Sequence, residues 1–282
     1  MATNPLHPLR YLHTIHAAPE CDRLRQVYCD VFGGLSFSEN YYPPEDRDAV
    51  LLYVADHMIE VMAPRHTDDL GFMYARYLQK TGPSYHSISF RVADCEAAHA
   101  RCNERDILIN TTGPQLIYLH PKSTGGIIME LTSHFMPNDP WDLPHWRRDW
   151  ATGRPDRPHA LAHLVCAPRF PARAIEFLVE SMDGKPGATS ELGWPQPARA
   201  TPVDVADITL LILEPVDTST GPLVDFASGP NSGVYALAWR LADPAAGADW
   251  FGRNGLEPTK VEDGGPYSYE LLLDGARHWL TD

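Results

Sequence analysis

The feature that most constrains the fold is an internal repeat. HTIHAAPECDRLRQVYCDVFGG (13–34) and HSISFRVADCEAAHARCNERDI (86–107) each read as a strand that opens with histidine, followed by an amphipathic helix carrying cysteine. Three strand-like runs follow each copy: GLSFSENYY, AVLLYVAD and MIEVMAP in the first, and ILINTT, LIYLHP and GIIMELT in the second. The sequence therefore predicts a unit of a strand, a helix and three strands (βαβββ), formed twice.

A weaker repeat doubles this pair of units. Offsets of 150 and 149 relate His13 to His163 and FRVAD (90–94) to WRLAD (239–243). Residues 136–158 are rich in Pro, Trp and Arg and read as a linker, because proline interrupts regular structure. We therefore expect an α+β chain with a first module at 1–135 and a second module at 159–282.

Four polar residues recur inside strands of the first module. His13 and His86 open corresponding strands, and Glu60 and Glu130 lie in the last strand of each unit. A buried carboxylate is costly unless it is paired or bound to a metal. Any one of these residues alone would be read as an ordinary buried polar group. Two units paired about a pseudo-twofold axis would bring all four together, and this donor set suits one divalent ion: Zn, Ni, Co, Mn or Fe.

The second module keeps the pattern without the donors. Tyr235 stands where His86 does, Thr209 or Leu210 where Glu60 does, and Glu270 alone echoes the other glutamate. We expect a degenerate module without a complete metal site.

Composition excludes several classes of function. The net charge is −14 without a Lys/Arg block, which argues against nucleic-acid binding. Five cysteines without a CxxC motif indicate no disulfide framework or zinc knuckle and favour a reducing cytoplasm. There is no basic-then-apolar leader, and the best apolar run, ITLLIL (208–213), is too short to span a membrane. We expect a cytoplasmic monomer or homodimer whose partner is a small-molecule substrate.

These motifs resemble the vicinal oxygen chelate superfamily, which includes glyoxalase I, methylmalonyl-CoA epimerase, extradiol dioxygenases and bleomycin-resistance proteins. YLHTIHAAPECDRLRQVY is similar to the first strand and helix of glyoxalase, whereas MIEVMAP and YLHPKSTGGIIMEL are most similar to the epimerase. The resemblance spans about residues 9–134. It implies two tandem modules with curled mixed sheets, and His13, Glu60, His86 and Glu130 as the metal ligands.

The resemblance also implies a class of chemistry. The first hypothesis is an epimerase, isomerase or lyase that acts through a metal-stabilised enolate on a small substrate with vicinal oxygens. Glu130 and Glu60 would be the catalytic proton shuttles, and Tyr118 and Lys122 are weaker candidates for substrate contacts. Two alternatives stay open: an Fe(II) extradiol ring-cleavage dioxygenase and a metal-free small-molecule binding protein.

Overall fold

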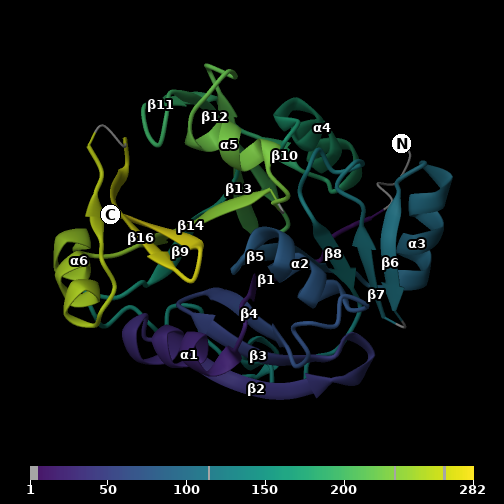
Figure 1. Ribbon diagram of the computed structural model, residues 1–282, viewed down its shortest axis with the longest axis horizontal. Coiled ribbons are helices and arrows are strands. Elements are labelled where there is room, and N and C mark those ends of the chain that lie inside the picture. The colour runs from purple at the N-terminus through teal and green to yellow at the C-terminus, as the bar shows by residue number, and fades with distance from the viewer. Residues whose placement is uncertain (1–5, 114, 232, 263–264) are drawn as a thin grey trace. The chain divides into compact units, whose positions relative to one another are not determined.

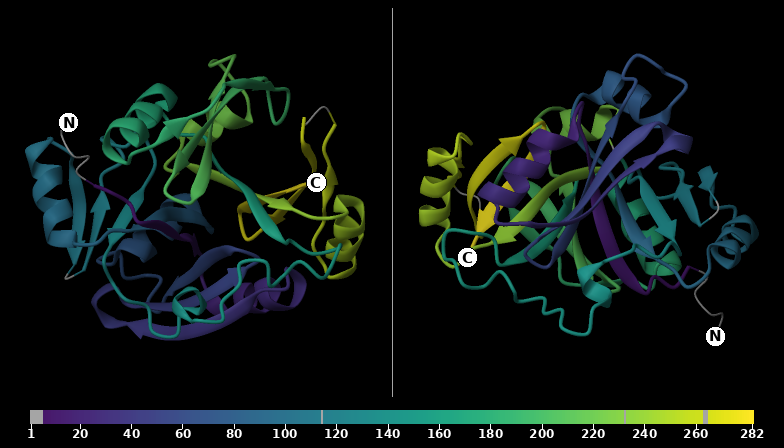
Figure 2. Two further views of the ribbon diagram at one scale, coloured as in Figure 1. Left: turned by 180° about the vertical axis from the view of Figure 1, so that it is seen from behind. Right: turned by 90° about the horizontal axis from the view of Figure 1, so that it is seen from below.

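The strands form two mixed sheets, one from each module. The computed structural model describes residues 6–113, 115–231, 233–262 and 265–282, which Figures 1 and 2 draw from three directions. The first sheet has the order β2-β3-β4-β1-β5-β8-β7-β6. The second has the order β10-β12-β13-β9-β14-β17-β16-β15, and β11 pairs with β12. The predicted α+β fold of tandem modules with paired βαβββ units is confirmed.

The first module contains the first two repeats. The first repeat comprises β1 (Arg10–Ala17), α1 (Cys21–Gln26), the π-helical turn η1 (Val27–Val31), β2 (Leu35–Tyr42), the 3-10 turn η2 (Pro43–Glu45), β3 (Arg47–Val54) and β4 (His57–Pro64). Helix α2 (Met73–Thr81) leads to the second repeat. That repeat comprises β5 (Ser84–Arg91), α3 (Cys95–Glu104), β6 (Ile109–Gly113), β7 (Leu116–Leu119) and β8 (Met129–Thr132).

The second module contains the third and fourth repeats. The predicted linker holds one 3-10 turn, η3 (Pro140–Asp142). The third repeat comprises β9 (Ala160–Cys166), α4 (Pro171–Ser181), β10 (Lys185–Pro186), β11 (Ser190–Leu192), β12 (Ala198–Val205) and β13 (Ile208–Pro215), and α5 (Pro222–Ser228) follows it. The fourth comprises β14 (Val234–Arg240), α6 (Pro244–Arg253), β15 (Thr259–Lys260), β16 (Tyr267–Leu273) and β17 (Ala276–Thr281). Across the described ranges, none of these helices has the length and apolar character needed to cross a membrane.

The helix near the start of each repeat packs on strands of the same repeat that follow it. Helix α1 contacts β3 and β4, and α3 contacts β7 and β8 (Figure 1). The first residue of each, Cys21 and Cys95, is buried. Asp94 begins α3 by accepting hydrogen bonds from the backbone N–H groups of Glu96 and Ala97, which satisfies donors that a helix start leaves open. Local capping and one apolar stripe thus explain where α3 starts and which side it buries.

The chain folds into two compact units, and each unit takes one repeat from each module. One consists of Met1–His13, Ser87–Phe135 and His163–Tyr235 (unit 1), and the other of Thr14–His86, Met136–Ala162 and Ala236–Asp282 (unit 2). Within unit 2 the predicted linker packs on the first repeat, since Trp150 Nε1 donates to Ala55 O at 2.7 Å. The boundaries at 135 and 159 stay a prediction.

In unit 1 the turn before β8 packs closely on α4. Gly125 and Gly126 have φ values of +73° and +117°, a region that favours glycine. A Cβ atom at Gly125 would collide with the backbone of Ala174, and Phe170 N donates to Gly125 O at 2.8 Å. The HPKSTGG stretch (120–126) is therefore an internal packing contact here.

In unit 2 a buried network of rings connects the first and fourth repeats. His16 Nδ1 lies 2.8 Å from the Tyr28 hydroxyl. Trp239 Nε1 donates to His278 Nδ1 at 3.0 Å, and the Tyr85 hydroxyl lies 3.3 Å from the same imidazole. Burial lowers the pKa of His16 to about 4 and that of His278 well below its ordinary value. Both imidazoles are therefore neutral at neutral pH.

Candidate functional site

The register of the parallel strands fixes which positions of the two repeats correspond. In the first repeat, Ile15 of β1 lies beside Glu60 of β4. In the second, Ser89 of β5 lies beside Glu130 of β8. Both glutamates are buried, with exposed fractions of 7% and 5%. The two carboxylates thus occupy equivalent places in the last strands of their repeats, as the sequence predicts.

The same register changes the assignment of the second histidine. Side chains alternate along a strand, so His13 shares the face of Ile15, and Ser87 shares the face of Ser89. Ser87, one residue after His86, therefore corresponds to His13. A signal was present in the sequence, because Cys21 and Cys95 at the helix starts are 74 positions apart whereas the histidines are 73 apart.

His86 lies on the opposite face of β5 from Ser87. Its ring packs against Tyr74 and Tyr77 of α2, with 4.7 Å between ring centroids in both cases. Burial, together with the positive charge of Arg47, lowers the pKa of His86 to about 3. The structure places His86 as a neutral imidazole among aromatic rings, away from the face of β5 that meets Glu130.

Glu60 has a cation of this chain beside it. Arg47 Nη1 donates to Glu60 Oε1 at 3.2 Å, and Arg47 Nε donates to Glu45 Oε2 at 2.6 Å. The guanidinium also lies over the rings of Tyr42 and Tyr74, at 5.1 and 5.6 Å from their centroids. Sequence reasoning missed Arg47, although a charged residue in register with Ala49 and Leu51 of an otherwise apolar strand face was a usable signal.

Glu130 has a hydroxyl group and an aromatic ring as neighbours in unit 1. Ser89 Oγ donates to Glu130 Oε1 at 3.1 Å. Tyr118 of β7 lies directly opposite Glu130 in the antiparallel register and is buried. Lys122, the other predicted substrate contact, is exposed in the turn that follows β7. Tyr118 therefore has the better position of the two.

The four predicted metal ligands are divided between the compact units. His13 and Glu130 belong to unit 1, and Glu60 and His86 to unit 2. Within the part of the chain that the structure describes, no group of three or more His, Cys, Asp or Glu side chains is arranged to hold a metal ion. The four-ligand site stays a prediction, and His86 is its least supported member.

The second module carries apolar residues at the positions of the two carboxylates. Leu211 lies beside Val165 in the third repeat, as Glu60 lies beside Ile15 in the first, so Leu211 rather than Thr209 or Leu210 stands at the position of Glu60. Trp279 lies beside Ala238 in the fourth repeat, the pair that matches Glu130 and its partner. These side chains offer no charged oxygen to a metal.

Glu270 is not the counterpart of Glu130, contrary to the expectation from sequence. It lies on β16, one strand before the equivalent position, directly opposite Trp279. Its carboxylate accepts hydrogen bonds from Trp279 Nε1 at 3.0 Å and from Arg277 Nη1 at 2.9 Å. Glu270 therefore serves an internal ion pair.

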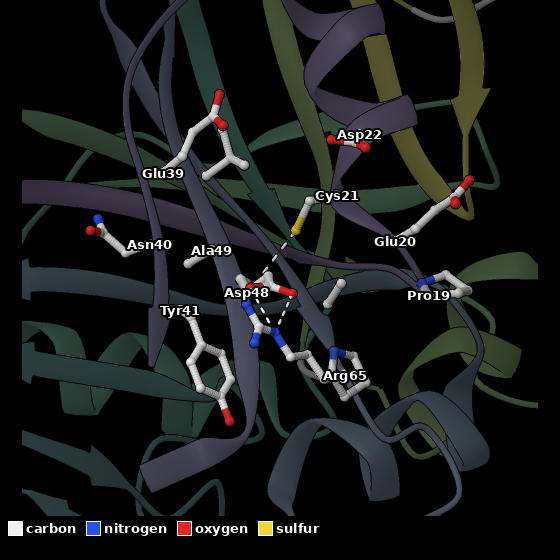
Figure 3. A pocket seen from close by; sticks show the side chains of 13 residues that line it. Pro19, Glu20, Cys21, Asp22, Glu39, Asn40, Tyr41, Asp48, Ala49 and Arg65 are labelled. Carbon is white, nitrogen blue, oxygen red and sulfur yellow. Dashed lines mark hydrogen bonds and ion pairs between the residues drawn. The ribbon is translucent and has the colours of Figure 1, made fainter. Parts of the chain in front are cut away.

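A pocket of about 740 Å³ lies on the other face of the first repeat (Figure 3). Asp48, which follows Arg47 in β3, lines it together with Cys21 and Arg65. Arg65 forms a two-pronged ion pair with Asp48, in which Nη2 lies 2.7 Å from Oδ1. Burial raises the pKa of the Cys21 thiol to about 12, so it stays protonated. This pocket contains none of the predicted ligands.

Comparison with known proteins agrees with this fold. Residues 12–115 match the family model of the Glyoxalase/Bleomycin resistance protein/Dioxygenase superfamily. Methylmalonyl-CoA epimerase, mitochondrial, of Mus musculus is 26% identical over 130 residues, which are 43% of this chain and 71% of that protein.

Two solved structures are also similar. A mutant of 4-hydroxymandelate synthase from Streptomyces coelicolor has a TM-score of 0.69 at 16% identity and covers 98% of this chain and 94% of its own. Methylmalonyl-CoA epimerase from Mycobacterium tuberculosis has a TM-score of 0.40 at 25% identity and covers 47% of this chain and 91% of its own.

Residues 12–115 are thus similar to the glyoxalase, or vicinal oxygen chelate, superfamily. A curated relative of this part is an epimerase, and nearly the whole chain shares the fold of the synthase.

Proposed function

We propose that this chain is a divalent-metal-dependent epimerase, isomerase or lyase that forms an enolate from a small substrate with vicinal oxygens. One observation carries the proposal: Glu60 and Glu130 are buried at corresponding positions of two repeats. Burying a carboxylate costs free energy, so a pair at matched positions points to a shared use. The likeness of the first module to the mitochondrial epimerase of Mus musculus supports this reaction class.

The proposed ligands are His13, Glu60 and Glu130, and the register adds the Ser87 hydroxyl at the remaining position. One imidazole and two carboxylates fit a first-row divalent ion by their chemistry. When bound, such an ion would supply positive charge that stabilises the negative charge developing on a substrate oxygen. His86 is retained only as the alternative fourth ligand, because it lies on the other face of β5.

The two carboxylates are proposed to differ in their roles. Glu130 accepts a hydrogen bond from Ser89 Oγ, which orients the carboxylate for taking a proton from the substrate carbon. Glu60 is paired with the guanidinium of Arg47, so it must give up this ion pair when it takes a proton. Glu130 is therefore the proposed proton acceptor, Glu60 the second shuttle, and Tyr118 a wall of the substrate site.

Metal analysis followed by isotope exchange tests this function. The purified protein is expected to contain about one divalent ion per chain. In deuterium oxide, a panel of 2-substituted thioesters and 2-oxo compounds should include one that gains deuterium at the reacting carbon without net oxidation. Glu270→Ala is the matched control for Glu130→Ala, because Glu270 serves the ion pair described above and should leave the metal content unchanged.

Three results would overturn the proposal. Metal-dependent oxygen consumption with a catechol would identify the dioxygenase alternative instead. Absence of a divalent ion from the purified protein would favour the metal-free binding protein, and metal content unchanged in both Glu60→Ala and Glu130→Ala would show that these carboxylates are not the ligands.

A further inference from the structure

Arg47 is a buried cation on the face of the sheet that carries Glu60. It begins β3, and its register partner is Pro64, so its side chain runs along the sheet to reach Glu60, which is opposite Leu51. The Arg47 and Glu60 side chains are only 10% and 9% exposed. A guanidinium so shielded from water interacts strongly with the charges around it.

The position of Arg47 is fixed from several sides. Glu45 anchors Nε at 2.6 Å, and Nη1 contacts Glu60 at 3.2 Å. Arg47 Cζ lies over the rings of Tyr42 and Tyr74, at 5.1 and 5.6 Å from their centroids. Tyr74 is itself fully buried in a core cluster that includes Ile15. Two carboxylates and two aromatic rings thus hold the Arg47 guanidinium in one position on this face.

We infer that Arg47 is the counter-ion that controls how tightly a divalent cation binds at Glu60; this inference rests on the proposed metal site. With Arg47 in place, an incoming cation must either share the Glu60 carboxylate with a positive charge or displace the guanidinium. Both routes weaken binding, because like charges repel strongly where water is excluded. The ion pair therefore sets the metal affinity of Glu60 below that of an unpaired carboxylate.

Co²⁺ titration of the full-length, metal-stripped protein tests this inference through the visible absorption of the bound ion. Arg47→Met keeps much of the side-chain volume and removes the charge, so the dissociation constant for Co²⁺ should fall by about tenfold. Arg47→Lys keeps the charge and should stay near the wild-type value. Arg65→Met is the matched control, because Arg65 pairs with Asp48 on the opposite face of the same sheet (Figure 3).

The outcomes separate this inference from the proposed function. Tighter Co²⁺ binding by Arg47→Met than by wild type, with Arg65→Met unchanged, supports both. If wild type fails to bind but Arg47→Met binds, the counter-ion role stands and the proposed function fails. If wild type binds and Arg47→Met binds equally or more weakly, the function stands and the inference is overturned. Absence of binding in both proteins overturns both.

A second variant covers the case in which Arg47→Met does not fold. Glu45→Gln removes the negative charge of the other carboxylate paired with Arg47, so more of the guanidinium charge acts on Glu60. Co²⁺ binding should then weaken by about threefold relative to wild type. Unchanged or tighter binding in Glu45→Gln would contradict the inference.

Discussion

Ser89 donates a hydrogen bond from its hydroxyl to the carboxylate of Glu130, with 3.1 Å between Oγ and Oε1, across two neighbouring parallel strands. In the first repeat, Ile15 stands at the corresponding position beside Glu60, and its side chain has no hydrogen-bond donor. Glu60 is instead contacted by a guanidinium. Two carboxylates at corresponding positions therefore have different neighbours, and an ion pair holds a negative charge more firmly than a hydroxyl does.

Replacing Ser89 by alanine should destabilise the fold. The variant removes a donor from a buried carboxylate, which costs about 1–2 kcal/mol of unfolding free energy near neutral pH. Urea denaturation followed by circular dichroism measures the change. Ser228→Ala is the control, because the Ser228 hydroxyl donates to a backbone carbonyl in an exposed position, and its loss should cost less than about 0.5 kcal/mol. Equal effects of the two variants would contradict the importance assigned to the Glu130 contact.

Gly125→Ala should destabilise the chain much more than Gly82→Ala. Both glycines have positive φ values, +73° at Gly125 and +71° at Gly82, so alanine strains the backbone at both. At Gly125 the added methyl group also collides with Ala174, whereas at Gly82 nothing lies within 4 Å. We expect a loss of about 1 kcal/mol at Gly82 from backbone strain alone, and of about 3 kcal/mol or more at Gly125. Thermal and urea unfolding of both variants check this, and a smaller loss at Gly125 than at Gly82 would show that the turn does not pack on α4 as described.

The unfolding free energy should fall as the pH drops from about 6.5 to about 4. The pKa of His16 is lowered to about 4 by burial, while an exposed histidine has a pKa of about 6.5. Between these values the unfolded chain binds a proton that the folded chain does not, which favours unfolding by up to roughly 3 kcal/mol. Above pH 6.5 both states are neutral and this contribution to the pH dependence vanishes.

Urea midpoints measured across this pH range test the assignment to His16. His16→Gln removes one of three buried imidazoles with lowered pKa values and should reduce the slope, while His86 and His278 keep the rest of it. His99→Gln, at a partly exposed position on α3, is the control and should keep the wild-type slope. A His16→Gln protein with the full wild-type slope would place the pH dependence elsewhere.

The strand register makes a sharp prediction about metal binding. His13→Gln should lower the Co²⁺ affinity by about a hundredfold, whereas His86→Gln should leave it within about twofold of wild type. Ser87→His places an imidazole at the position that corresponds to His13 and should tighten binding by about tenfold. Calorimetric titration of the three variants measures these changes. Strong loss in His86→Gln with no gain in Ser87→His would restore His86 as the ligand.

The repeat architecture could be predicted from the sequence because periodicity and spacing encode it directly. The histidine and glutamate spacing predicted four equivalent strand positions, and the carboxylates do lie at matched places. His86 as a ligand stays a prediction, and the register instead puts Ser87 at the position that corresponds to His13, because the sequence comparison matched residue identities without the strand pairing. A shift of one residue moves a side chain to the opposite face of a strand, so only the paired strands reveal it.

Contacts between distant parts of the chain could not be predicted. No local pattern indicates that Arg47 reaches Glu60, because the contact depends on a long side chain running along a sheet. The same holds for Glu270, whose strand was misassigned because the last hairpin of the fourth repeat has a different length. Nor does any spacing show that the HPKSTGG turn meets α4.

Each compact unit contains one repeat from each module, joined through a single polypeptide. Because one chain links the repeats of the two modules, their association is intramolecular and does not weaken when the protein is diluted. Residues 159–282 therefore contribute to the fold even with apolar side chains at the two carboxylate positions, since without them both repeats of the first module would lack the repeat with which each forms a compact unit.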